Sequence, residues 1–479
     1  MKPKYGLLTA ISMVVGIVIG SGVFFKAGKV LVNTGGNMLQ TLAVVAIIGV
    51  IMMICSLIFA KLATRYEKVN GVVDYAEVTI GPRYAYMVAW FLTTIYYPTL
   101  TSCLAWISAQ YTCALFGLPV AGAAHVAIGA LYLVGIYVLN ALSPKLGGKL
   151  QVSTTIIKLI PLALMAVVGT IAGMANGLTI PAFQTTTQQI GQSGGGMLGA
   201  IVAFAFAYEG WIIATSINAE LKDSKKNLPK ALIIGAIIVI AVYLLYFLGM
   251  TGSMSVPDMI QAGDNLPGIA FTNVFGTFVG SIIYVFIVIS CLGTTNGLMM
   301  GSIRGAYSMA ARGRGIAPKA LSQVDPHSNA PTNSALVGLL VCTLWYFYWQ
   351  ICFIQGAELG IPALINWEPD ELPIITLYGS YIPMFICMMI KHKEFNKFQR
   401  FVMPMLGIIA CIFMVYCAVV AYGIQCVYYL IVFAVIMLIG ALFMKEKSIG
   451  VSEVEKVVVQ VGDVTIEETI TDTIRVTQD

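Results

Sequence analysis

The chain has 479 residues, of which 58% are hydrophobic and only 10% are charged, and its formal net charge is +5. Ordinary soluble domains carry roughly 25% charged residues, and a single packed core stops growing at about 250–300 residues. The composition therefore argues against a soluble protein and predicts an all-α protein in a lipid bilayer. The positive charge is interpreted by its position in the loops, and nucleic acid is not expected as a partner.

Cysteine and histidine patterns give no support for a cofactor or a metal. All ten cysteines fall within apolar stretches and none forms a C-x-x-C pair, so we expect them to pack as small hydrophobic side chains. His125, His327 and His392 are too few and too scattered for a metal cluster. We predict no catalytic residue, no metal and no cofactor.

Apolar runs of about 20 residues, the length that crosses a bilayer as a helix, occur twelve times. The first follows Lys2 and Lys4 and could be taken for a signal peptide. It is longer than the apolar part of such a peptide and lacks an A-x-A-like site, so we interpret it as the first membrane helix. The predicted spans are residues 7–35, 38–63, 84–116, 122–142, 152–175, 196–220, 231–251, 277–306, 333–354, 373–390, 402–424 and 426–444.

The links between these spans alternate in charge. Those after even-numbered spans are rich in Lys and Arg, whereas four links after odd-numbered spans contain neither: residues 117–121, 176–195, 252–276 and 355–372. Basic loops stay in the cytoplasm, so the pattern predicts a multi-pass protein of the plasma (cell) membrane with both termini cytoplasmic. Only Lys26 and Lys29, near the outer end of the first span, depart from it.

Residues 446–479 are polar and acidic, unlike the rest of the chain. Their alternation of Val, Thr and Ile with Glu and Asp would fit a short strand pair, but a two-stranded unit alone is marginally stable. We expect a twelve-helix domain over residues 1–445 and, over 446–479, an acidic cytoplasmic tail that is disordered.

Two spans are predicted to be interrupted. The first contains GIVIGSGVFF at 16–25, where clustered glycines disfavour helix because each costs about 1 kcal/mol relative to Ala. The alternative for Gly16 and Gly20 is a seam for close helix packing. The sixth contains FAYEGW at 206–211, and its carboxylate is costly at membrane depth unless it faces a cavity or a partner.

The sixth span stands five after the first, so the two interruptions occupy equivalent places in two five-helix halves. This arrangement is typical of transporters built from inverted repeats. An interrupted helix exposes N–H groups at one end and carbonyls at the other. Their partial charges suit the carboxylate and ammonium of an amino acid, so no charged side chain is required at the recognition centre.

These motifs resemble those of the amino acid–polyamine–organocation (APC) transporters, especially the L-type amino-acid exchanger (LAT) branch and its bacterial serine/threonine or alanine/serine/cysteine exchangers. The similarity covers about residues 5–445. It rests on GSGVF at 20–24, FAYEGW at 206–211, IKLIP at 157–161, ELKD at 220–223, NLPKA at 227–231, Asn296, Arg304 and GIAP at 315–318. The resemblance implies a LeuT-type 5+5 inverted repeat, over about 7–175 and 196–390, with helices 11 and 12 (402–444) outside it.

Carried over position by position, the resemblance implies roles for residues at both breaks. The N–H groups of Ser21, Gly22 and Val23 would hold the substrate carboxylate. Carbonyls near Val18, Phe206 and Glu209 would take its ammonium, and the Phe206 ring would form an outer gate. The predicted substrate-binding residues are Val18, Ile19, Gly20, Ser21, Gly22, Val23, Phe206, Ala207, Tyr208, Glu209 and Gly210.

Lys158 is the one basic residue that we place inside a span. Its ammonium either snorkels to the interface or occupies the place of sodium in sodium-coupled relatives of this fold. In that place it would bridge span five to the first break and to span eight near Ser290. It could instead carry a coupling proton. Tyr243, in the seventh span, is a candidate for gating, although a structural aromatic is the simpler interpretation.

Glu209 has two interpretations. It either contacts the substrate, which would favour cationic amino acids, or points away toward another helix; we favour the second. Ile212 stands where several relatives for large neutral substrates have Asn, which argues against such substrates. The loop at 117–124 lacks the cysteine through which animal members bond a heavy chain, so we expect no covalent heavy-chain partner.

The sequence therefore predicts a secondary transporter of small neutral L-amino acids that works by sodium-independent exchange. Three alternatives stay open: a proton-coupled symporter, a transporter of cationic amino acids or polyamines, and an amino-acid sensor on a transporter fold. A membrane enzyme is not expected, because no nucleophile, base or metal-ligand arrangement falls within a span. A channel is not expected either, since no ring of polar pore residues recurs.

Overall fold

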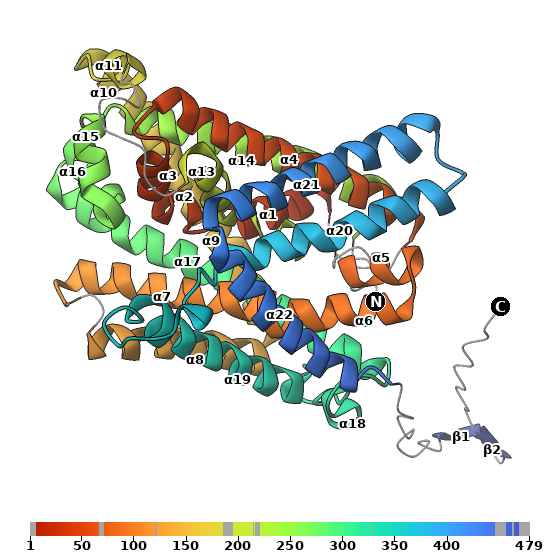
Figure 1. Ribbon diagram of the computed structural model, residues 1–479. Helices are drawn as coiled ribbons and strands as arrows, with labels where there is room; N and C mark the ends of the chain where they lie inside the picture. The colour runs from red at the N-terminus through yellow and green to blue at the C-terminus, as the bar shows by residue number, and fades with distance from the viewer. Residues whose placement is uncertain are drawn as a thin grey trace.

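The computed structural model describes residues 6–66, 71–119, 122–184, 195–213, 215, 221–328, 330–445, 457–461 and 464–468. Apart from two short strands, the described elements are helices, which confirms the predicted all-α membrane domain (Figure 1). This follows from the bilayer, where backbone groups must be paired within each segment.

The first half of the domain contains the first five predicted spans. Its elements are α1 (Leu7–Val18), α2 (Gly22–Phe25), α3 (Ala27–Asn33), α4 (Met38–Arg65), α5 (Val72–Thr79), α6 (Pro82–Phe91), η1 (Leu92–Tyr96), α7 (Tyr97–Phe116), α8 (Ala123–Leu142), α9 (Pro144–Leu164), η2 (Met165–Gly169), α10 (Thr170–Ala175) and α11 (Thr179–Gln184).

The second half contains the remaining spans and the tail. Its elements are α13 (Gly196–Ala205), η3 (Phe206–Tyr208), α14 (Ser224–Met250), α15 (Val256–Ala262), η5 (Gly263–Asn265), α16 (Leu266–Phe275), α17 (Thr277–Ala311), α18 (Pro318–Leu321), α19 (Thr332–Tyr348), η6 (Trp349–Ile354), η7 (Ala363–Ile365), α20 (Leu372–Lys391), η8 (Phe398–Val402), α21 (Met403–Tyr422), α22 (Ile424–Leu442), β1 (Val457–Val461) and β2 (Val464–Glu468).

Eleven helical stretches in the described residues are long and apolar enough to cross a membrane. The predicted third span is not among them, yet α6, η1 and α7 follow one another without a gap from Pro82 to Phe116. This helix carries many Tyr, Thr and Ser residues, which lower its hydropathy. Because every residue of its stretch from Tyr97 to Cys113 is buried, the helix meets protein rather than lipid and does not need an apolar surface.

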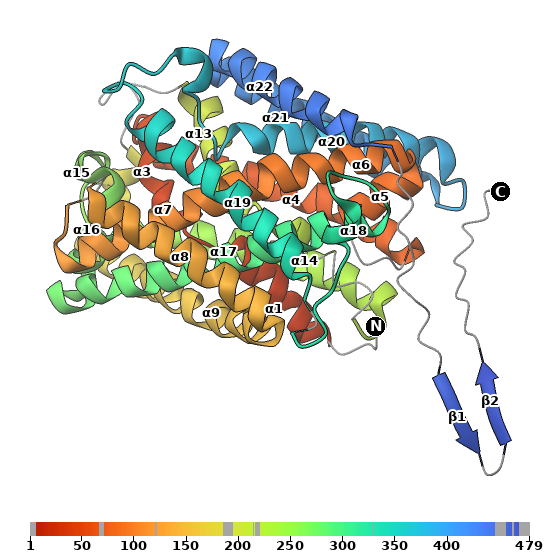
Figure 2. The ribbon, with the colours of Figure 1, turned by 90° about the horizontal axis from the view of Figure 1, so that it is seen from below.

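The connections gather at two ends of the bundle, which we call the α15 end and the α18 end. Figures 1 and 2 show α15 and α16 at the left-hand end and α5 and α18 at the right-hand end, and Figure 1 also shows α11 at the left-hand end. The links predicted to lack basic residues hold α11, α15 and α16, whereas the basic links hold α5 and α18. The charge alternation in the sequence therefore corresponds to two opposite ends of the molecule.

The acidic tail contains an antiparallel strand pair, β1 and β2, in which Val461 pairs with Val464. This is the alternative that the alternating pattern allowed. The remaining tail residues, and most of the second half of the sixth span, lie outside the described part of the chain.

Candidate substrate site

The first predicted break is present. α1 ends at Val18 and α2 begins at Gly22, so residues 19–21 are not helical. Ile19, directly after α1, has extended dihedral angles of φ −71° and ψ 99°. A Cβ added at Gly22 would lie 2.5 Å from the Cα atom of Ala207. Glycine therefore lets the first break touch the second.

The second predicted break is also present. α13 ends at Ala205, one 3-10 turn follows over Phe206–Tyr208, and Glu209 is extended, with φ −80° and ψ 166°. Gly210 then has φ +94°, a conformation that residues with a Cβ rarely adopt. A Cβ there would also lie 2.7 Å from Cγ2 of Ile17. Both the backbone angle and the contact with α1 therefore require glycine.

Tyr243 of α14 joins the two breaks. Its hydroxyl donates to the Ala207 carbonyl at 2.8 Å and lies 3.3 Å from the Val18 carbonyl. Where a helix is interrupted, carbonyls at its end have no backbone N–H group to bond with, and the Tyr243 hydroxyl donates in its place. The Tyr243 ring is fully buried and lies edge-on to Phe204 and Tyr208. These contacts give Tyr243 a structural role beside the breaks.

A cavity of about 20 Å³ lies between the breaks. It has room for about one water molecule, so an amino acid fits only after the surrounding helices separate. The cavity is lined by six residues of the predicted set and four that the sequence did not point to: Val18, Gly20, Ser21, Gly22, Phe206 and Glu209, with Leu100, Leu104, Thr294 and Leu298.

The other five predicted binding residues are buried but do not line this cavity. Tyr208 turns toward α4, where its hydroxyl donates to the Val45 carbonyl at 3.0 Å. Ala207 and Gly210 contact the first helix, as described above. In the present closed conformation the lining set is therefore smaller than predicted, and it excludes Ile19, Val23, Ala207, Tyr208 and Gly210.

Glu209 lies at the boundary between the cavity and η1. Its carboxylate accepts a hydrogen bond from the Tyr96 hydroxyl, and the residue is only 5% exposed. Tyr96 is fully buried in η1, within the predicted third span. The Glu209 side chain therefore has a partner on another helix while part of the residue still lines the cavity.

Lys158 of α9 reaches the first break from the other side. Its ammonium donates to the Gly16 carbonyl at 2.6 Å and lies 3.3 Å from the Thr294 hydroxyl. The side chain is 0% exposed, so it does not snorkel to the interface. It bridges α9, α1 and α17, the helix of the eighth span. Its contact there is Thr294, one turn beyond Ser290.

A cluster of buried charges lies at the α15 end of the first helix. Lys26 lies 2.6 Å from Asp370 and 2.5 Å from Glu371, and Lys29 lies 2.7 Å from Glu368 and 2.8 Å from Glu371. We call these five residues the ion cluster. The three carboxylates are close enough together to hold a metal ion, but the two ammonium groups already neutralise most of their charge.

The ion cluster joins the first helix to the beginning of α20. Glu371 also accepts a hydrogen bond from Tyr422, at the end of α21. Burial alone would raise the pKa of Glu371, but the charges of Lys26 and Lys29 lower it to about 2. Burial raises the pKa of Glu368 to about 7, and the neighbouring Glu371 charge adds to this rise. Three carboxylates facing two lysines leave one of them easy to protonate.

The ion cluster is also next to the predicted outer gate. The Lys26 ammonium lies 5.5 Å from the centre of the Phe206 ring, within the range of a cation–π contact. Phe206 in turn lines the cavity. The sequence marked Lys26 and Lys29 only as exceptions to the charge pattern. Nothing in the sequence paired them with the three carboxylates, because more than 300 residues separate the two groups.

Comparison with known proteins agrees with this architecture. Residues 5–446 match the model of a family described as amino acid permease. The chain is 30% identical over 403 residues to the serine/threonine exchanger SteT of Bacillus subtilis, covering 84% of this chain and 86% of the relative. It is 27% identical over 429 residues to the human b(0,+)-type amino acid transporter 1, covering 88% and 83%. The chain therefore belongs to the amino acid permease family of the APC superfamily, whose members are transporters rather than enzymes.

Proposed function

We propose that this protein exchanges small neutral L-amino acids across the plasma membrane, without sodium, by alternating access. A small substrate is supported by Leu100, Leu104 and Leu298, which line the cavity from α7 and α17. A neutral substrate is supported by the hydrogen bond that the Glu209 carboxylate accepts from Tyr96. Exchange is supported by the similarity to a protein named as a serine/threonine exchanger.

The main support for sodium-independent exchange is the position of Lys158. A buried cation costs several kcal/mol unless its surroundings compensate it. Here the compensation comes from the Gly16 carbonyl and the Thr294 hydroxyl, which are also the kind of oxygen ligand that a metal cation would use. A fixed ammonium between α9, α1 and α17 performs the structural work of a bound ion.

In this proposal the two breaks divide the recognition of the substrate. The N–H groups of Ser21, Gly22 and Val23, at the beginning of α2, bind the carboxylate. Carbonyls of Val18, Phe206 and Glu209 bind the ammonium. The Phe206 ring separates the cavity from the ion cluster. Movement of Phe206 together with the first helix then opens the site toward the α15 end.

A second candidate is a proton-coupled symporter. Within the described residues Lys158 forms no salt bridge, so no carboxylate fixes its ammonium in the charged form. Loss of a proton would weaken its bond to the Gly16 carbonyl and loosen α1. The same lysine would then couple a proton to the movement of the first helix.

The test uses radiolabelled serine and purified protein in proteoliposomes, without sodium and without a pH gradient. Uptake only into vesicles preloaded with unlabelled serine would support exchange. Uptake into empty vesicles that begins when an inward proton gradient is imposed would replace the exchanger with the symporter. Uptake of labelled arginine in preference to serine would overturn the neutral substrate and point to Glu209. Specific binding of serine without uptake under any of these conditions would instead favour an amino-acid sensor.

The orientation and partners are part of the same proposal. The basic links at the α18 end support a cytoplasmic position for that end and for both termini. No covalent heavy chain is proposed, because the nearest cysteine to the loop after α7, Cys113, is fully buried within that helix. Labelling of cysteines engineered at the α18 end from one side of intact cells tests the orientation.

A further inference from the structure

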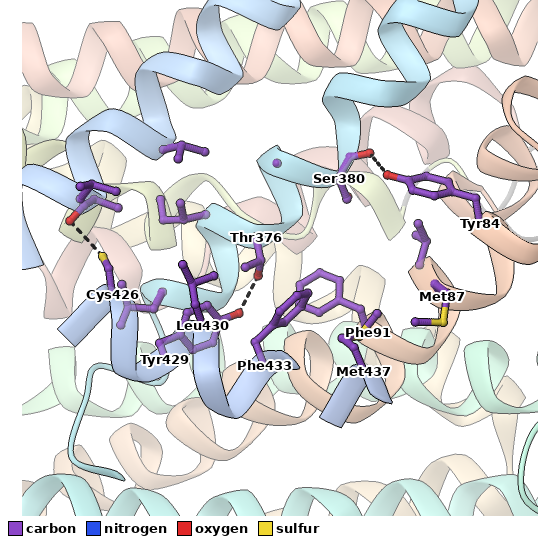
Figure 3. Close-up of a pocket in the computed structure, with 17 residues that line it drawn as sticks. Tyr84, Met87, Phe91, Thr376, Ser380, Cys426, Tyr429, Leu430, Phe433 and Met437 are labelled. Atoms are coloured by element: carbon purple, nitrogen blue, oxygen red, sulfur yellow. Dashed lines mark hydrogen bonds between the residues drawn. The ribbon is translucent and has the colours of Figure 1, made fainter. Parts of the chain in front are cut away.

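A large pocket that shares no lining residue with the substrate cavity lies between α6, α20, α21 and α22 (Figure 3). Its volume is about 380 Å³, many times that of the substrate cavity. Figure 2 shows these four helices next to one another along one side of the bundle. Three of them, α20, α21 and α22, belong to membrane-spanning stretches. The pocket therefore lies at the depth of the hydrocarbon layer.

Figure 3 draws three hydrogen bonds in the pocket wall as dashed lines, and the polar side-chain groups that form them are therefore already paired. The Tyr84 hydroxyl donates to the Ser380 carbonyl at 2.7 Å, and the Thr376 and Tyr429 hydroxyls lie 2.6 Å apart. The Cys426 thiol donates to the Ala418 carbonyl. The remaining lining is almost entirely hydrocarbon. A ligand with polar groups would have to leave them unpaired in this pocket, so the pocket fits an apolar ligand.

The pocket extends along α22. Its lining on α22 extends from Cys426 to Met437, which at 1.5 Å per residue is about 16 Å along the helix. Its deep wall is buried: Phe91, Leu372 and Ile375 are 2%, 1% and 7% exposed. Its rim opens to the surroundings of the bundle, because Val419 and Leu430 are 52% and 46% exposed.

We propose that this pocket binds one acyl chain of a membrane lipid. The bilayer supplies such chains at its mouth, and the polar groups of the wall are already paired. A helix from a second copy of the protein is the competing occupant, and the experiment below distinguishes it from an acyl chain.

The acyl chain would pack behind a helix that supports the second break. Thr376 and Gly379 of α20 face the pocket. On the opposite side of the same helix, the Tyr381 ring lies 6.3 Å from Trp211 and 4.9 Å from Phe59. Trp211 follows Gly210 directly in the second break. The bound chain thereby fills the space that would otherwise let α20 move away from the site.

Gly379 provides a direct test. A Cβ added there meets no atom within 4 Å, and Gly379 lines the pocket, so the side chain of Gly379→Leu begins in open space at the pocket wall. Gly135→Leu is the matched control, because Gly135 lies on α8, outside the pocket, and also has nothing within 4 Å. Both substitutions replace glycine by a good helix former.

The experiment places the full chain in nanodiscs of phosphatidylcholine with a photoactivatable diazirine in one acyl chain, and maps the labelled residues by mass spectrometry. We expect label on Phe91 and Ile375, which lipid at the surface does not reach, in the unsubstituted protein and in Gly135→Leu. Gly379→Leu should lose the label at these two residues and keep label at exposed residues such as Leu438.

Three results would overturn the proposal. The first is an unsubstituted protein labelled only at exposed residues, an outcome that does not depend on whether any variant folds. The second is self-association of the unsubstituted protein in the nanodiscs that Gly379→Leu abolishes and Gly135→Leu does not, since this would make a second copy the occupant. Equal label at Phe91 and Ile375 in all three proteins would also count against it, provided Gly379→Leu retains its uptake of serine.

Discussion

Two buried lysines hold the first helix of this protein, and their surroundings are opposite. Lys26 is 3% exposed and lies between the carboxylates of Asp370 and Glu371. Lys158 is 0% exposed and meets only a carbonyl and a hydroxyl, from Gly16 and Thr294. Lys26 lies on the α15 side of the first break. Lys158 contacts α1, the helix before that break.

The comparison teaches that burial of a charge does not by itself define its role. Lys26 is compensated by full opposite charges, so removing it leaves carboxylates unpaired in the interior. Lys158 is compensated by the dipoles of a carbonyl and a hydroxyl, and in the proposed function its ammonium takes the place of a bound cation. We therefore expect the first lysine to determine stability and the second to determine transport.

The largest effect on stability is expected for Lys26→Met. Breaking a buried pair by removing one partner typically costs about 3–5 kcal/mol, because the other charge remains buried. Denaturant titration of the protein in detergent measures the loss of unfolding free energy. Lys29→Met is the comparison variant; its side chain is 34% exposed, so its cost should be clearly smaller. Equal losses of stability in the two variants would mean that the burial of Lys26 does not determine its contribution.

Lys158→Met should separate the two lysines most sharply. It leaves the Gly16 carbonyl without its donor, which costs about 1–3 kcal/mol, but it leaves no unpaired charge. Serine exchange in proteoliposomes should be lost. The control is Thr294→Val, which keeps the bond to Gly16 and should retain part of the exchange. If Lys158→Met proves less stable than Lys26→Met, the distinction between the two sites is wrong.

The ion cluster should also make stability depend on pH. Because the folded pKa of Glu368 is about 7, against about 4.3 for an unfolded glutamate, the folded state binds an extra proton between these values. Stability should therefore fall as pH rises through this window, by at most about 1.4 kcal/mol per pH unit. Glu371, with its pKa lowered to about 2, contributes stability that is complete above about pH 4.3 and lost only below it.

Glu368→Gln should flatten the pH dependence between about pH 4 and pH 7. Glu358→Gln, an exposed residue of the same loop, should leave it unchanged. Thermal unfolding in detergent at a series of pH values measures both. A slope that persists in Glu368→Gln would show that another group, outside this cluster, binds the proton.

The smallest effect is expected for Tyr243→Phe, the neutral counterpart of Lys158. Its hydroxyl bonds carbonyls of both breaks, at Ala207 and Val18. Loss of a neutral hydrogen bond costs about 1 kcal/mol, and the ring contacts remain. Exchange should persist at a reduced rate. Complete loss of serine exchange in a stably folded variant would give Tyr243 the gating role that its contacts do not require.

Local features of the sequence were sufficient for the spans and the breaks. Apolar runs marked the helices, including the buried third helix, which overall hydropathy alone does not identify. The clustered glycines at 16–22 and the Glu209–Gly210 pair marked the breaks, because these residues disfavour a continuous helix wherever they occur. The alternation of basic loops marked the two ends of the bundle.

The sequence by itself therefore determined that the protein lies in a lipid bilayer, where its helices and their interruptions fall, and which family motifs it has. Only the tertiary structure decided which residues meet: Lys26 with Glu371, Lys158 with Thr294, and Tyr96 with Glu209. The physical reason is range. A helix or a break depends on neighbours within a few turns, whereas these pairs are more than 100 residues apart. They form only because the membrane helices pack in one particular order.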